Sequence, residues 1–137
     1  MHDENIEKEI VELFVQKKVR KRVEYELSSK KKRINAFFRL NHSKLTLNQK
    51  TIHPIHKADP DDVIQKLIEL GASENKAYFM GYTEEDGSYV TLAEAIDMAF
   101  KFGMPVIVYC GNGIGYIQGE QMYGPAERFL LIAQNHS

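Results

Sequence analysis

The spacing of apolar residues divides this chain into a helical first part and a strand-forming last part. Between residues 4 and 28, apolar side chains recur every three or four positions with charged residues between them, which predicts one long amphipathic helix. The Ser28-Ser29 pair can end that helix and cap a second one that runs to about residue 41. Short apolar runs at residues 106–110, 114–118 and 128–133 predict strands.

Capping residues predict two further helices in the middle of the chain. Asp59 can cap a helix that begins with Pro60, and Thr91 with Glu94 forms a capping box for the next helix. Each helix is followed by a glycine, which favours the left-handed backbone of a helix C-terminus; these are Gly71 and Gly103.

The remaining segments complete an α+β prediction. Residues 77–83 are aromatic and strand-like, and the turn at 85–87 closes them. Residues 42–58 indicate an extended arm or an edge strand, because Pro54 cannot donate a ladder hydrogen bond. The pattern predicts N-terminal helices packed on a mostly antiparallel four-stranded sheet, a two-layer sandwich.

The glycine-rich run at residues 111–115 has two competing interpretations. A phosphate-binding loop would follow a strand, as this run does, but it must lead directly into a helix. Here the residues from Ile114 to Gln118 are strand-like. We therefore predict a hairpin turn with Asn112 and Gly113 at its tip, and no nucleotide cofactor.

Length and composition indicate one ordinary globular domain over residues 1–137, with a basic helical portion at about 4–41. Of the 137 residues, 43% are apolar and 27% charged, which is far from the composition of disordered chains. No secretion signal or membrane span is evident, so we expect a cytoplasmic protein. The single cysteine, Cys110, lies in an apolar run and is expected to be a buried thiol.

Charge is distributed unevenly along the chain. The first 57 residues contain 14 of the 18 Lys and Arg and 7 of the 19 Asp and Glu, so the two parts carry about +7 and −8. Such asymmetry bears on partners and on rates of encounter. The densest basic segment indicates an RNA- or DNA-binding surface, with a solvated helix face as the alternative. Its cationic residues are Lys17, Lys18, Arg20, Lys21, Arg22, Lys30, Lys31, Lys32 and Arg33.

The second part of the chain offers a carboxylate and tyrosine surface suited to a cationic protein partner. The candidate residues are Asp59, Asp61, Asp62, Glu84, Glu85, Asp86, Tyr116, Glu120, Tyr123 and Glu127. A helix N-terminus and turn chemistry are the simpler explanations for the first six.

Three histidines, His42, His53 and His56, invite a metal or catalytic interpretation. Zinc takes four ligands, or three and a water molecule, and Pro54 prevents a regular helical spacing of His53 and His56. A metal-free nuclease would use two imidazoles with a lysine such as Lys44 or Lys57. Histidines in polar loops are usually solvated, so we expect neither a metal nor an enzyme.

Three segments resemble small bacterial immunity proteins of contact-dependent growth inhibition and related toxin systems. They are the sequence RINAFFRLNH, the pattern DG-x-x-x-x-L-x-E-A-I, and the succession of strand, glycine turn, Gly-Glu and Arg-Phe-Leu-Leu over residues 106–131. The resemblance implies a cytosolic, non-enzymatic protein that binds a toxin domain, often a nuclease. It leads us to expect an immunity-type inhibitor that covers a basic nuclease with its acidic part; nucleic-acid binding by the basic segment is the alternative.

Overall fold

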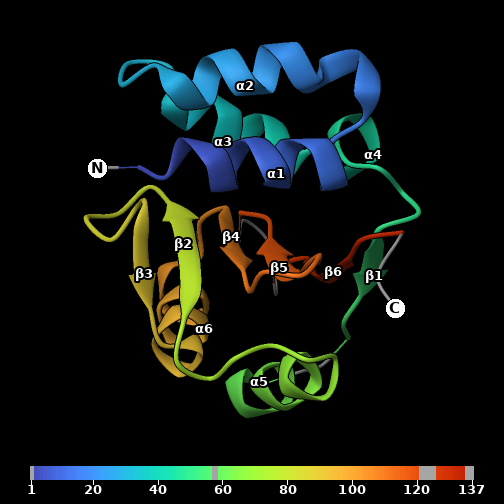
Figure 1. Ribbon diagram of the computed structural model, residues 1–137, viewed down its shortest axis with the longest axis vertical. Coiled ribbons are helices and arrows are strands. Elements are labelled where there is room, and N and C mark those ends of the chain that lie inside the picture. Colours follow the sequence, from blue (N-terminus) through green and yellow to red (C-terminus); the bar gives the residue numbers. More distant parts are fainter. Residues whose placement is uncertain (1, 57–58, 121–125, 135–137) are drawn as a thin grey trace.

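Six strands form one antiparallel sheet in the computed structural model, which describes residues 2–56, 59–120 and 126–134 (Figure 1). The strand order is β1-β6-β5-β4-β2-β3. The bounds are β1 Ile52–Pro54, β2 Ala77–Gly81, β3 Ser88–Val90, β4 Val106–Tyr109, β5 Ile114–Gln118 and β6 Arg128–Ile132. The α+β class is confirmed. The four-stranded count is wrong, because the sheet has two further three-residue strands at its edges. One is β1, which lies in the segment expected to be an extended arm or an edge strand, and the other is β3, which was not predicted.

Helices cover both faces of this sheet, so the two-layer prediction is wrong and the molecule has three layers. The N-terminal helices lie over one face, and α5 and α6 lie under the other (Figure 1). The helices are α1 Glu4–Phe14, the 3₁₀ helix η1 Lys17–Val19, α2 Arg20–Ser28, α3 Arg33–Asn41, α4 Ser43–Thr46, α5 Pro60–Glu69 and α6 Leu92–Phe102. Every residue of β2, β4 and β5 is buried, because these strands have apolar cover on both sides.

The single helix expected over residues 4–28 is instead two helices with a break after Phe14. Val15 takes an extended conformation and forms an isolated antiparallel bridge with Leu47. The Gln16 N–H donates to the Thr46 carbonyl at 2.8 Å, which fixes the break. The chain then turns back, and α2 packs on α1 and α3 from outside. A pairing with a distant segment thus overrides the continuous local pattern.

The middle and C-terminal predictions are confirmed closely. Capping boxes open α5 at Asp59 and α6 at Thr91. Gly103 has φ +62° at the end of α6. The chain turns between β4 and β5 with φ +54° at Asn112 and +76° at Gly113, and Ile114 begins a strand. The glycine-rich run is therefore a hairpin.

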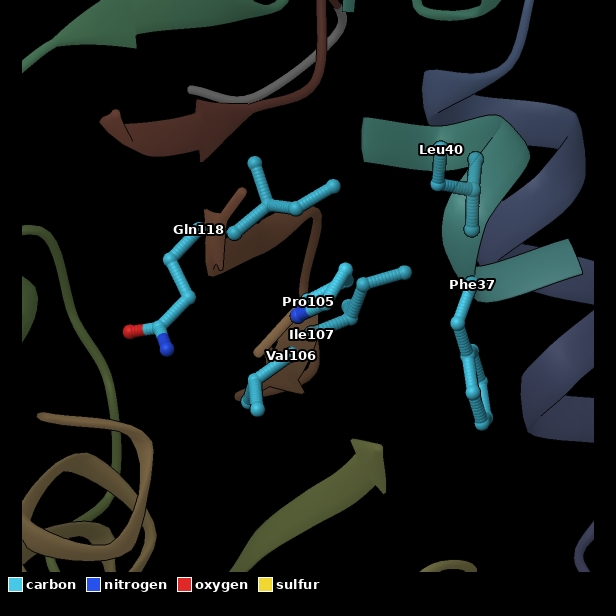
Figure 2. A pocket seen from close by; sticks show the side chains of 7 residues that line it. Phe37, Leu40, Pro105, Val106, Ile107 and Gln118 are labelled. Carbon is cyan, nitrogen blue, oxygen red and sulfur yellow. The ribbon is translucent and has the colours of Figure 1, made fainter. Parts of the chain in front are cut away.

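The core contact between α3 and the sheet is shown in Figure 2. Phe37 and Leu40 of α3 face Pro105 and Ile107, while Gln118 points away towards the opposite layer. The gap among these side chains has no room for a water molecule, so it is a packing seam and not a ligand cavity.

Candidate functional site

Four of the predicted acidic residues lie at one end of the sheet. The register aligns Gly81, Val106 and Gln118 on neighbouring strands β2, β4 and β5, and Gln118 with Arg128 on β6. Glu84 and Glu85 are in the turn that follows β2, Glu120 follows β5, and Glu127 precedes β6. Because neighbouring strands lie about 4.8 Å apart, the segments that carry these carboxylates lie within about 15 Å of one another at this end of the sheet.

Exposed aromatic rings accompany the carboxylates at this end. Tyr82, directly after β2, is 65% exposed, and Phe102, at the end of α6 and four residues before β4, is 43% exposed. We call this set the strand-end surface; it comprises Tyr82, Glu84, Glu85, Phe102, Glu120 and Glu127. Large aromatic side chains are enriched at protein interfaces, and a group of carboxylates is complementary to a cationic partner.

A buried ionic network anchors the β2–β3 turn to the helices. Arg33, only 5% exposed, donates to both carboxylate oxygens of Glu7 at 2.6 and 2.5 Å and to Asp86 at 2.6 and 3.0 Å. Tyr78 also donates to Glu7 at 2.5 Å. Burial opposes the charged form of Arg33, but the hydrogen bonds to Glu7 and Asp86 outweigh it and raise the guanidinium pKa.

A second network holds the neighbouring loops. Gln118 Nε2 donates to the carbonyls of Ala99 at 2.6 Å and Met104 at 2.9 Å, which joins the end of β5 to the α6–β4 connection. Arg128 donates to Gln118 Oε1 at 2.7 Å. The Gly119 N–H donates to the Glu127 carbonyl at 2.9 Å. The backbone that presents the strand-end surface is therefore fixed at several points.

Several residues of the predicted acidic surface are buried, bonded internally or located elsewhere in the structure. The prediction of Tyr116 as a surface residue is wrong, because its side chain lies in the core. Burial raises the pKa of Tyr116 to about 12, and the hydrogen bond from Arg128 partly offsets this effect. Asp86 is bound to Arg33. Asp59 and Asp62 form the capping box of α5, a helix that lies well away from the β2–β3 turn, and Asp61 is exposed on the same helix (Figure 1). Tyr123 lies outside the described residues.

The basic candidates gather on the outer helix of the N-terminal layer. Lys17, Lys18, Lys21, Arg22, Lys30, Lys31 and Lys32 are all exposed on η1, α2 and the following turn. The prediction of Arg33 as a surface residue is wrong, because its guanidinium is the centre of the buried network. Arg20 is half-buried and donates to the Val15 carbonyl at 2.9 Å.

Tyr25 is a surface residue that the charge pattern of the sequence does not single out. It is 57% exposed on α2, and the Lys32 ammonium lies 5.7 Å from its ring centroid. The spacing of Tyr25, four residues after Lys21 and three after Arg22, is the signal that would have placed these side chains together.

The carboxylate of Glu26, on the inner side of α2, is buried and paired with Arg39 at 2.8 Å and Arg22 at 3.5 Å. The hydrogen bond from Arg39 outweighs the effect of burial and lowers the pKa of Glu26. This acid therefore stays charged inside the helix packing, and α2 presents mainly its cations to solvent.

An open groove of about 420 Å³ lies between α3, η1 and α4. It is lined by Val19, Asn35, Phe38, Arg39, His42, Leu45 and Thr46. His42 is exposed in this groove, whereas His53 and His56 are exposed at and after the edge strand β1. Among the described residues, no three His, Cys, Asp or Glu side chains are close enough together to hold a metal ion.

Cys110 follows β4, and burial raises its thiol pKa to about 12, so the sulfur is held as a thiol at neutral pH.

No helix in the described part of the chain is long and apolar enough to cross a membrane. No protein-family model matches the chain, and no curated protein or solved structure was found to be similar to it.

Proposed function

We propose that this protein is an immunity-type inhibitor that binds a basic toxin domain, most suitably a nuclease, through the strand-end surface. The observation that carries the proposal is the location of exposed Tyr82 and Phe102 at the same end of the sheet as the carboxylates of the strand-end surface. A nuclease binds a polyanion, and a cluster of carboxylates is electrostatically complementary to the same site.

The fixed backbone supports tight binding. Asp86 is held by Arg33, and the Gly81 N–H also donates to Asp86 Oδ1 at 3.3 Å, so the turn that carries Glu84 and Glu85 is tied at both its ends. A surface that is already ordered loses less conformational entropy when it binds a partner. The exposed rings supply the large, rigid contacts that dominate binding energy at protein interfaces.

Capture from lysate of the native host, followed by a nuclease assay, tests this function. The captured domain should cleave RNA or DNA when released, and a stoichiometric amount of this protein should stop the cleavage.

The Glu84→Lys/Glu85→Lys variant should slow association with the captured domain at least about tenfold at low salt, because surface charges steer encounter. Tyr82→Ala should chiefly speed dissociation.

The matched control is Glu69→Lys/Asp97→Lys, which makes the same change of charge at two exposed carboxylates on α5 and α6, outside the strand-end surface. This control should leave association unchanged within about twofold. A captured domain that keeps its full activity in excess protein, or equal effects of the two double variants, would contradict the proposal.

A further inference from the structure

A stripe of exposed side chains runs along the outer face of α2 and has no role in the proposed inhibition. Lys18 of η1 and Lys21, Arg22, Tyr25 and Ser28 of α2 follow one another at steps of one or three residues. All five are exposed, whereas Val23 and Leu27 face inward. At 1.5 Å per residue, the stripe from residue 18 to residue 28 is about 15 Å long. In Figure 1, α2 is the helix that lies farthest from the sheet.

Most of the exposed charged side chains on this face are positive. The turn after α2 adds the exposed Lys30, Lys31 and Lys32, while the Glu26 carboxylate is buried and held by Arg39. Glu24 is half-buried on the same helix. A close row of ammonium and guanidinium groups matches a chain of phosphates, whose binding releases condensed counterions.

The exposed Tyr25 ring gives this basic face a feature beyond charge. More than half of its side chain is open to solvent, in the middle of the stripe. The Lys32 ammonium lies over this ring, 5.7 Å from its centroid, so a cation and an aromatic side chain stand together on this face. Bases stack on aromatic side chains only when they are not already stacked within a duplex.

We propose that the outer face of η1 and α2 is a binding site for single-stranded nucleic acid. Lys18, Lys21 and Arg22 contact the phosphates, and Tyr25 stacks with one base. The inference does not depend on the proposed inhibition, because its residues lie outside the strand-end surface. Each function can therefore fail without the other.

Fluorescence anisotropy with labelled oligouridylate, oligothymidylate and a short DNA duplex tests the site across a range of salt concentrations. The wild-type protein should bind both single strands more tightly than the duplex. Lys18→Gln/Lys21→Gln should reduce the slope of log K against log salt by about 0.7 for each phosphate that the variant no longer binds. The control Lys66→Gln/Lys101→Gln, which removes exposed lysines from the opposite layer, should not change the slope.

Substitution of the tyrosine separates stacking from simple charge attraction. Tyr25→Ala should weaken binding at least about fivefold while the salt slope stays as in the wild type. Tyr82→Ala, which removes an exposed tyrosine elsewhere, should bind as the wild type does. Lack of binding at low salt would overturn the proposal. Tighter binding of the duplex than of the single strands would also overturn it. So would an equal decrease of the salt slope in Lys18→Gln/Lys21→Gln and in Lys66→Gln/Lys101→Gln, or wild-type affinity in Tyr25→Ala.

Discussion

At the scale of single residues, Arg33 connects three separate parts of the molecule. It begins α3, and its guanidinium bonds Glu7 of α1, Asp86 of the β2–β3 turn and the Leu27 carbonyl of α2, the last at 2.9 Å. Removing the cation would leave the Glu7 carboxylate buried without its counter-charge. A buried charge that loses its partner costs far more than a surface charge does.

We therefore expect Arg33→Met to lower the free energy of unfolding by about 3–5 kcal/mol in urea denaturation. The control Lys31→Met removes an exposed cation two residues away and should change it by no more than about 0.5 kcal/mol. A decrease below about 1 kcal/mol in Arg33→Met would show that the network contributes little to stability.

The same residue shows what sequence patterns cannot supply. The charge pattern places Arg33 and Asp86 on opposite charged surfaces, yet they are 53 positions apart and bond one another internally. Nothing in the local charge pattern separates Arg33 from the three exposed lysines before it. Tyr116 likewise resembles the surface tyrosines in its local sequence and is distinguished only by the cover of α6, where Phe100 stacks on it with ring centroids 6.2 Å apart.

At the scale of elements, the β4–β5 hairpin offers a comparison of two glycines with similar backbones. Gly111 has φ +82° and open space where an added Cβ would lie, whereas a Cβ on Gly113, at φ +76°, would lie 2.8 Å from the Ala133 Cβ. Gly111→Ala should cost about 1–2 kcal/mol through backbone strain alone. Gly113→Ala should cost at least about 1 kcal/mol more, because the clash adds to the strain. Urea denaturation of both variants measures the difference, and equal costs would show that Ala133 moves aside freely.

Elements with local signals were predicted well, and elements that depend on distant partners were not. The caps at Asp59 and Thr91 lie within three residues of the groups they bond, so the sequence predicts α5 and α6. The break after Phe14 depends instead on Leu47, and the three-residue strand β3 exists only because β2 pairs with it. Short edge strands carry too few residues to show a period.

At the scale of the whole molecule, charge asymmetry along the chain only partly matches charge asymmetry in space. The first 57 residues are basic in sum, yet α1 is acidic, with Glu4, Glu7, Glu9 and Glu12 against Lys8. Among the described residues, the densest group of exposed cations therefore lies on η1, α2 and the turn after it. Among the predicted acidic residues, those at the strand end share a surface, and those of α5 belong to another layer.

The layered arrangement also predicts a gradient of local stability. Helix α2 packs mainly on α1 and α3 and buries two apolar side chains, Val23 and Leu27, with the Glu26 carboxylate. Strands β4 and β5 lie inside the sheet and are buried on both faces. Regions with few buried apolar contacts open at a lower free energy than the central core. In native-state hydrogen exchange, the α2 amides should therefore exchange at least about tenfold faster than those of β4 and β5. Equal protection of α2 and the central strands would instead mean that the helical layer and the sheet open only together, as one cooperative unit.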